Sequence, residues 1–208
     1  MLYDKDIREP LFDFLEERYG KVRIIEEKQM GRSRADVIVV RPGSLTGIEI
    51  KSDADSYARL ARQVKDYDRY FDYNFVAVGS SHARHIKEHV PEWWGIVTVE
   101  QIDNGIDFYV LREAVKNPGR VLRAKLGLLW RPELVHIQEM NQMPKYREKS
   151  KSFVIDKILM KVSEEMLDEQ ISQELFERDY TIIAETIEGY KREQKKRRRL
   201  PLRKKENL

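Results

Sequence analysis

The sequence of 208 residues contains no cysteine, which excludes structural disulfides and zinc sites built on thiolates. Nor does it contain an apolar run near the ~18 residues of a membrane-spanning helix, and its first residues do not resemble a signal peptide. Hydrophobic residues make up 41% of the chain and charged residues 36%, a balance that favours a globular fold with a hydrated surface. We therefore expect a cytoplasmic protein with no membrane partner.

The net charge of +3 conceals a strongly basic stretch at residues 191–208. This stretch holds ten Lys or Arg and two Glu, whereas the other 190 residues hold 29 basic and 34 acidic side chains. Such a tail can bind nucleic acid by neutralising phosphates and releasing counterions; the alternative is a solvated tail that keeps the chain soluble. The expected phosphate contacts in this tail are Lys195, Lys196, Arg197, Arg198 and Arg199.

The order of apolar patterns predicts an α/β fold with a mixed sheet flanked by helices. A helix is followed by three strands joined by short turns, and helices and strands then alternate before a final hairpin at Asp103-Asn104-Gly105. A strand, a helix and a second strand in succession indicate parallel neighbours. We expect helices at residues 4–18, 52–71 and 80–90, and strands at residues 22–29, 37–40, 45–50, 75–79, 96–99 and 106–111.

After about residue 120 no further strand is predicted. We therefore divide the chain into a sheet domain at 1–120, a helical region at 121–190 and a basic tail at 191–208, which we expect to be disordered. The expected helices of the second region span residues 126–130, 132–140, 152–166 and 175–190.

A basic connector separates two of these helices, and the arrangement resembles the SAP-type DNA-binding module. Lys145, Arg147, Lys149 and Lys151 would face phosphates. A helical appendage used for packing or dimerisation is an equal alternative.

Three charged residues lie in the central pair of predicted strands. Asp36 opens the first strand, and Glu49 and Lys51 lie two residues apart in the second, so their side chains share one face. Charges in a mostly buried strand are costly unless they are paired or bind a metal. Two carboxylates suit Mg²⁺ or Mn²⁺, the carbonyl of Ile50 could add a ligand, and Lys51 could position water or contact a phosphate. The alternative is a simple Glu–Lys ion pair.

The spacing of Asp36 and the run Glu49-Ile50-Lys51 resembles the PD-(D/E)XK nuclease motif. Residues 48–53, 59–67, 91–96 and 128–134 resemble the sce7726 family, a bacterial and phage group within that superfamily. The resemblance implies a restriction-endonuclease-like core. Residue 35 is alanine where the motif's name has proline, a position without a chemical role.

The resemblance also implies roles for individual residues. Asp36 and Glu49 would bind the metal, Lys51 would be the catalytic lysine, and Gln63 would support the site. A further metal-binding acid often comes from the first helix of such proteins. Glu9 is the candidate for that acid, and Glu27 on the strand before the hairpin is its rival.

These observations predict a Mg²⁺- or Mn²⁺-dependent endonuclease that cuts DNA in repair, recombination or phage and host defence. RNA stays open as a substrate. A homodimer is also expected as one mode of assembly, because superfamily members that cut both strands often dimerise. The rival prediction is a catalytically silent nucleic-acid-binding or assembly protein built on a nuclease-like fold. Trp93 and Trp94 could stack on bases, but at a turn we expect them to pack in the core.

Removing residues 191–208 should weaken DNA binding and make it less dependent on salt. Each lost phosphate contact lowers the slope of log affinity against log salt by about 0.9 on duplex DNA. Fluorescence anisotropy of a labelled duplex across a salt titration measures both quantities. Equal affinity and slope in the full and shortened chains would assign the tail another role.

Overall fold

The computed structural model describes residues 2–103 and 105–179. The chain divides into one compact unit of Met1–Phe176 and a second of Glu177–Leu208. The phosphate contacts expected at Lys195, Lys196 and Arg197 to Arg199 lie outside the described residues, as does most of the helix expected at 175–190. The following description concerns the first unit.

Six strands form one mixed sheet in sequential order. The first three, β1 (Arg23–Met30), β2 (Ser33–Arg41) and β3 (Ser44–Lys51), make an antiparallel meander. β4 (Tyr73–Gly79) and β5 (Gly95–Ile102) follow in parallel with β3, and β6 (Gly105–Arg112) closes the series as an antiparallel hairpin. The predicted mixed α/β sheet flanked by helices is confirmed.

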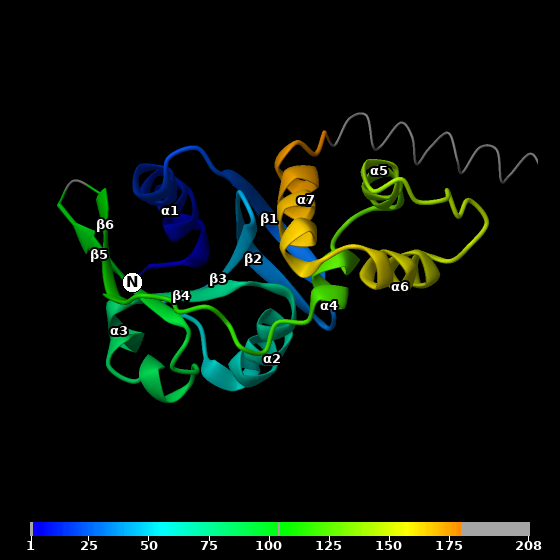
Figure 1. The fold of residues 1–208 in the computed structure, drawn as a ribbon. Coiled ribbons are helices and arrows are strands. Elements are labelled where there is room, and N and C mark those ends of the chain that lie inside the picture. The colour runs from blue at the N-terminus through cyan, green and yellow to red at the C-terminus, as the bar shows by residue number, and fades with distance from the viewer. Residues whose placement is uncertain (1, 104, 180–208) are drawn as a thin grey trace, which may run out of the picture. The chain divides into compact units, whose positions relative to one another are not determined.

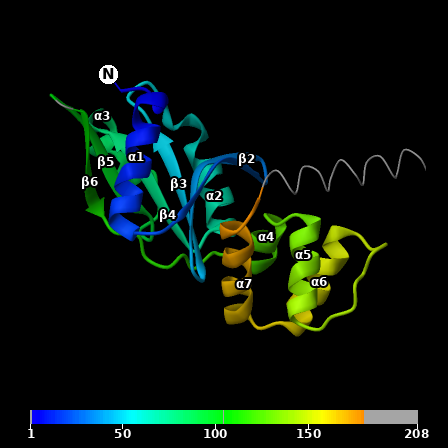
Figure 2. The ribbon, with the colours of Figure 1, turned by 90° about the horizontal axis from the view of Figure 1, so that it is seen from above.

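Helices cover both faces of this sheet (Figures 1 and 2). α1 (Asp4–Tyr19) buries Ile7, Leu11 and Leu15 in a cluster with apolar side chains of β2 and β3. On the other face α2 (Leu60–Tyr70) buries Leu60, Val64 and Tyr67. The alternation of side chains along β3 divides them between the two clusters: Ile48 and Ile50 face α1, whereas Leu45 faces α2.

The helix expected at residues 80–90 is instead a short α3 (Ser80–Ala83) and a 3₁₀ turn at Ile86–Glu88. The carbonyl of His82 accepts hydrogen bonds from the amide of His85 and from the hydroxyl of Tyr57, so the backbone tightens to a three-residue spacing. In the helix expected at residues 52–71, residues 52–56 are not helical; a 3₁₀ turn at Tyr57–Arg59 comes first, and α2 follows it.

The helix expected at residues 152–166 is interrupted by Val162 and Ser163. α6 (Lys151–Lys161) ends there, and α7 (Glu164–Phe176) begins. The hydroxyl of Ser163 accepts a hydrogen bond from the amide of Met166, which is the geometry of a helix N-cap. The run Ser-Glu-Glu was therefore a start signal in the sequence, and the prediction overlooked it.

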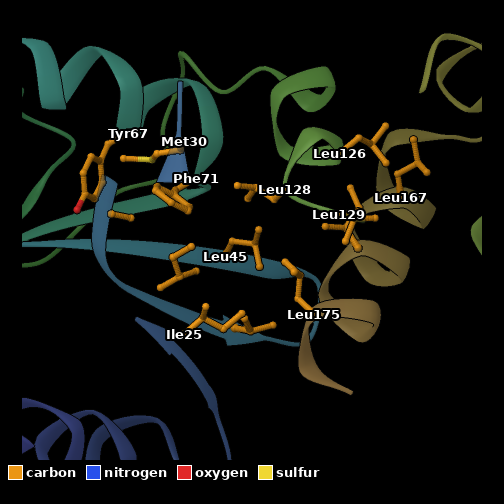
Figure 3. Close-up of a cluster of buried hydrophobic side chains, with 14 of the residues drawn as sticks. Ile25, Met30, Leu45, Tyr67, Phe71, Leu126, Leu128, Leu129, Leu167 and Leu175 are labelled. Carbon is orange, nitrogen blue, oxygen red and sulfur yellow. The ribbon is translucent and has the colours of Figure 1, made fainter. Parts of the chain in front are cut away.

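The helical region after residue 120 shares a core with the sheet. α4 (Leu122–Gly127), α5 (Arg131–Met140), α6 and α7 all contribute to the cluster that contains the α2 face of the sheet. Figure 3 shows Leu128, which follows α4, and Leu175 of α7 near Leu45 of β3. The boundary expected near residue 120 thus falls inside one compact unit.

A buried ionic network joins the same elements. The ammonium of Lys125, which is fully buried, lies 2.7 Å from Oδ2 of Asp72 and 2.6 Å from Oδ1 of Asp168. Arg120 binds both carboxylates as well, at 3.1 Å and 2.5 Å. Asp72 also accepts a hydrogen bond from the amide of Leu45 at the start of β3. The network therefore ties α4 and α7 to the sheet.

Lys125→Met should destabilise the protein by about 3 kcal/mol, because removing the cation leaves two carboxylates with only Arg120 to neutralise them. Urea unfolding followed by circular dichroism measures the change. Arg123→Met is the matched control, since Arg123 pairs with Asp156 at the surface and such pairs contribute at most about 1 kcal/mol. Equal losses in the two variants would contradict this role for the network.

Candidate functional site

A cleft of about 530 Å³ opens at the end of the sheet where β2 begins and β3 ends. It is lined by residues of α1, β1, the β1–β2 turn, β2, β3 and the start of α2. The cleft brings together the predicted catalytic residues Asp36, Glu49, Lys51 and Gln63, and Ile50 also lines it. The structure therefore brings these residues together at one cleft, and their predicted roles stay predictions.

Glu49 and Lys51 form a buried ion pair on the α2 side of β3. The two side chains are 1% and 5% exposed, and Nζ of Lys51 lies 2.6 Å from Oε1 of Glu49. Gln63 of α2 joins them: its amide nitrogen donates to the same Oε1, and its amide oxygen accepts from Lys51 at 3.2 Å. All three side chains thus hold one another in place, and both donors use the same carboxylate oxygen.

The second oxygen of Glu49 has no partner. Oε2 is buried and makes no hydrogen bond within the described residues. An unpaired carboxylate oxygen costs free energy in a buried position, so it marks a place where a cation or donor from outside the chain would be stabilised.

Asp36 lies on β2 next to this pair. Its Oδ2 accepts a hydrogen bond from the amide of Ile50 at 2.9 Å. Burial, and next the negative charge of Glu49, raise the pKa of the Asp36 carboxyl to about 7. A cation between the two carboxylates would relieve that repulsion.

Tyr67 of α2 fixes the relative position of the two strands at this point. Its hydroxyl accepts from the amide of Asp36 at 3.2 Å and donates to the carbonyl of Ile48 at 3.1 Å. The side chain is fully buried, and burial raises its pKa well above the ordinary value, so the hydroxyl stays protonated. Tyr67 therefore supplies two hydrogen bonds where β2 and β3 need them.

The residues fit a hard divalent cation in part. Asp36 and Glu49 provide oxygen ligands on adjacent strands, and Mg²⁺ is often held by one or two carboxylates with waters completing its shell. Within the described part of the chain, however, no three His, Asp or Glu residues are arranged to hold a metal. The third acid is thus not in place.

The two predicted third acids have different positions. Glu9 is exposed and does not line the cleft. Glu27 lines the cleft, but its carboxylate lies 3.2 Å from Arg34. Its backbone has a φ of 49°, a strained value for this residue type, and it is opposite Asp36 where the pairing of β1 with β2 is interrupted.

Sequence reasoning missed Asp4 and Arg8, which line the cleft from α1. The two residues form an ion pair at 2.8 Å, and Arg8 also donates to the carbonyl of Asp36 at 3.1 Å. The signal was their spacing of four residues at the start of a helix, which places both side chains on one face.

The basic connector of the helical region does not contribute to the cleft. Lys145 pairs with Glu139, Lys149 lies over the ring of Phe153, and Lys151 donates to the carbonyl of Gly127 at 2.7 Å. Arg147 is exposed. Their proposed role in phosphate binding stays a prediction.

Trp93 and Trp94, which lie just before β5, both pack against the hydrophobic core. The indole nitrogens of Trp93 and Trp94 donate to the same oxygen of Asp68, at 3.1 Å and 2.8 Å, and Trp94 is fully buried. Burial raises the pKa of the Asp68 carboxyl. The expected packing role is confirmed.

The fold and the cleft define an α/β protein whose buried carboxylate pair lies at the end of a mixed sheet. The chain belongs to the family described as bacteriophage P4 protein cII, whose model matches residues 1–197. The predicted sce7726 relationship was not tested by this match and stays a prediction. No helix among the described residues is long and apolar enough to cross a membrane.

No curated protein matches the sequence. Among solved structures, the SfsA protein of Pyrococcus furiosus in complex with Ca²⁺ is similar to 53% of this chain, at 16% identity and a TM-score of 0.33. The similarity covers 62% of the SfsA chain.

Asp36→Asn should stabilise the metal-free protein most at pH 8 and clearly less at pH 5. The folded pKa of about 7 exceeds the ordinary 3.8, so the folded state binds a proton more tightly and loses stability as pH rises towards 7. We expect a gain on the order of 2 kcal/mol at pH 8 after allowance for solvent screening.

Urea unfolding in EDTA at the two pH values measures this gain. Asp13→Asn, which changes an exposed carboxylate of α1, is the control. If Asp36→Asn has the same effect at both pH values, the raised pKa is contradicted.

Proposed function

We propose that this protein is a Mg²⁺- or Mn²⁺-dependent deoxyribonuclease that hydrolyses phosphodiester bonds, most simply as an endonuclease in DNA repair, recombination or phage and host defence. One observation carries the proposal. Two carboxylates on adjacent strands, Asp36 and Glu49, lie at a cleft beside the ammonium of Lys51, and one oxygen of Glu49 makes no hydrogen bond with residues 2–103 or 105–179. We expect this activity in the cytoplasm.

The residues that would hold the cation are Asp36 and Glu49, with the carbonyl of Ile50 as a further oxygen. When bound, the cation would offset charge on the phosphate and make its water easier to deprotonate. Glu49 is prepared for this role, because Lys51 and Gln63 both bind Oε1 and leave Oε2 free.

Lys51 would act on the reacting phosphate. Two of its hydrogen bonds go to Glu49 and Gln63, which fix the ammonium at the cleft. Its remaining donor capacity can hold a phosphate oxygen or the attacking water, and its charge offsets the negative charge that develops as the bond breaks. Gln63 would position both charged side chains without contacting the substrate.

One observation favours the alternative of a catalytically silent nucleic-acid-binding or assembly protein. No third carboxylate is arranged with Asp36 and Glu49 among the described residues. Against it, the pair itself costs free energy through burial and repulsion, and a protein with no use for the pair would be more stable without it.

Supercoiled, linear and single-stranded DNA incubated with Mg²⁺, Mn²⁺ or EDTA should be cut only when metal is present. Asp36→Asn, Glu49→Gln and Lys51→Met should each lower the rate by at least on the order of 100-fold, because each removes a group acting on the reacting phosphate. Gel electrophoresis of the products measures the rates. Glu100→Gln, an exposed change on β5, should cut at the wild-type rate.

If the wild-type protein cuts no probe, the nuclease proposal is refuted, and the catalytically silent nucleic-acid-binding or assembly protein remains. If wild type and the three site variants cut equally well, the observed activity does not come from Asp36, Glu49 and Lys51.

A further inference from the structure

The cleft holds more positive charge than its own carboxylates neutralise. Of the cations that line it, Arg8 pairs with Asp4, Arg34 with Glu27 and Lys51 with Glu49. The carboxylate of Asp55, also in the lining, accepts hydrogen bonds from the amide and hydroxyl of Ser52.

Three arginines of the cleft stand outside these pairs. Arg32, Arg59 and Arg62 line it and are exposed, and within the described residues none of them makes an ion pair or a side-chain hydrogen bond. Three guanidinium groups without an ion pair among the described residues thus line a cleft that also contains Asp36 and Glu49.

These arginines lie along one side of the cleft. Arg59 ends the 3₁₀ turn that leads into α2, and Arg62 lies three residues later in the first turn of the helix, so their side chains point to the same side. Arg32 belongs to the β1–β2 turn, which packs against the same helix: a Cβ placed on Gly31 would lie 2.8 Å from Oδ1 of Asp66 on α2. Gln63, which contacts Glu49 and Lys51, follows Arg62 directly.

We propose that Arg32, Arg59 and Arg62 form a phosphate-binding rim that holds the sugar–phosphate backbone of a polynucleotide next to the acid pair. This rests on the proposed function and goes further, because it assigns substrate binding to the cleft itself rather than to the helical connector or the basic tail. The planar guanidinium group binds phosphate through two parallel hydrogen bonds. Successive phosphates of a strand present such groups at regular spacing, as a single small anion does not.

The rim also solves an electrostatic problem of the site. A polyanion approaching Asp36 and Glu49 is repelled by their charge, and Lys51, which lies beside these acids, already pairs with Glu49. Contacts to phosphates flanking the reacting one would supply the missing attraction without occupying the acids.

The test uses the full chain carrying Glu49→Gln, so that binding is measured without cleavage. The probes are labelled single strands and duplexes of DNA and of RNA, each about 20 nucleotides long. Fluorescence anisotropy across a salt titration gives the affinity and the slope of log affinity against log salt. Changing Arg32, Arg59 and Arg62 together to Gln should weaken binding at least about 30-fold at low salt. It should also make the slope of log affinity against log salt shallower by about 2 on single strands, at roughly 0.7 per lost contact.

The probe with the largest loss identifies the substrate class. Arg69→Gln is the matched control, because Arg69 is exposed on the same helix but does not line the cleft. A set of Arg→Lys changes keeps the charge and should restore the slope but only part of the affinity. Circular dichroism checks that the variants are folded.

Unchanged affinity and slope in the triple variant on all four probes, or an equal loss in Arg69→Gln, would overturn the rim. The outcome is separate from the nuclease test, in which cleavage is measured first on the wild-type chain with Glu49 intact. A protein that binds through the rim but cuts nothing would keep this inference and refute the catalytic one. If the protein cuts DNA and changing the three arginines has no effect on binding, the catalytic proposal stands and the phosphate-binding rim is refuted.

Discussion

The site depends on the burial of two opposite charges in a central strand. Glu49 and Lys51 project from the same face of β3, and their side chains are only 1% and 5% exposed, so water solvates neither charge fully. Each is tolerable only because the other is 2.6 Å away and Gln63 bonds to both. The pairing uses one oxygen of Glu49, and the other oxygen makes no hydrogen bond among the residues that the structure describes. The chain therefore keeps two buried charges paired while one carboxylate oxygen is left unsatisfied.

This constraint sets the position of α2. The helix must place Gln63 beside the ion pair, and one turn later it must place Tyr67 between the amide of Asp36 and the carbonyl of Ile48. The spacing of four residues puts both on the same helix face, so one face of α2 serves the polar site and the core together. Tyr67 also contacts the rings of Phe71 and Trp94 in the core. A shift of α2 along its axis would break the site and the core at once.

The sequence predicted the parts of this site that follow a strand period, and it failed where the backbone departs from one. Asp36, Glu49 and Lys51 lie in strands, so the strand pattern predicted that they are close together, whereas the role of Gln63 came from the resemblance to the nuclease family. Glu27 was ambiguous because its left-handed backbone interrupts the pairing of β1 with β2, a feature that composition does not reveal. Arg32, Arg59 and Arg62 looked like ordinary surface charges, since what distinguishes them is the lack of a partner in space. The 3₁₀ turns near His82 depended on a distant donor, Tyr57.

The helical region contributes at the opposite end of the same strand. Asp72 bonds to the amide of Leu45 at the start of β3 and to Lys125 of α4, whereas the site begins at Glu49 and ends at Lys51. Six residues of extended strand separate Leu45 from Lys51, which is about 20 Å. Asp168 and Glu164 of α7 complete the network through Arg120.

The strand that carries Glu49 and Lys51 is thus stabilised at its other end by a second set of buried charges. Because the two sets share no residue, the ionic network can stabilise the fold without fixing the protonation or occupancy of the cleft. That separation allows the acid pair to stay incompletely satisfied in a protein that is otherwise well packed.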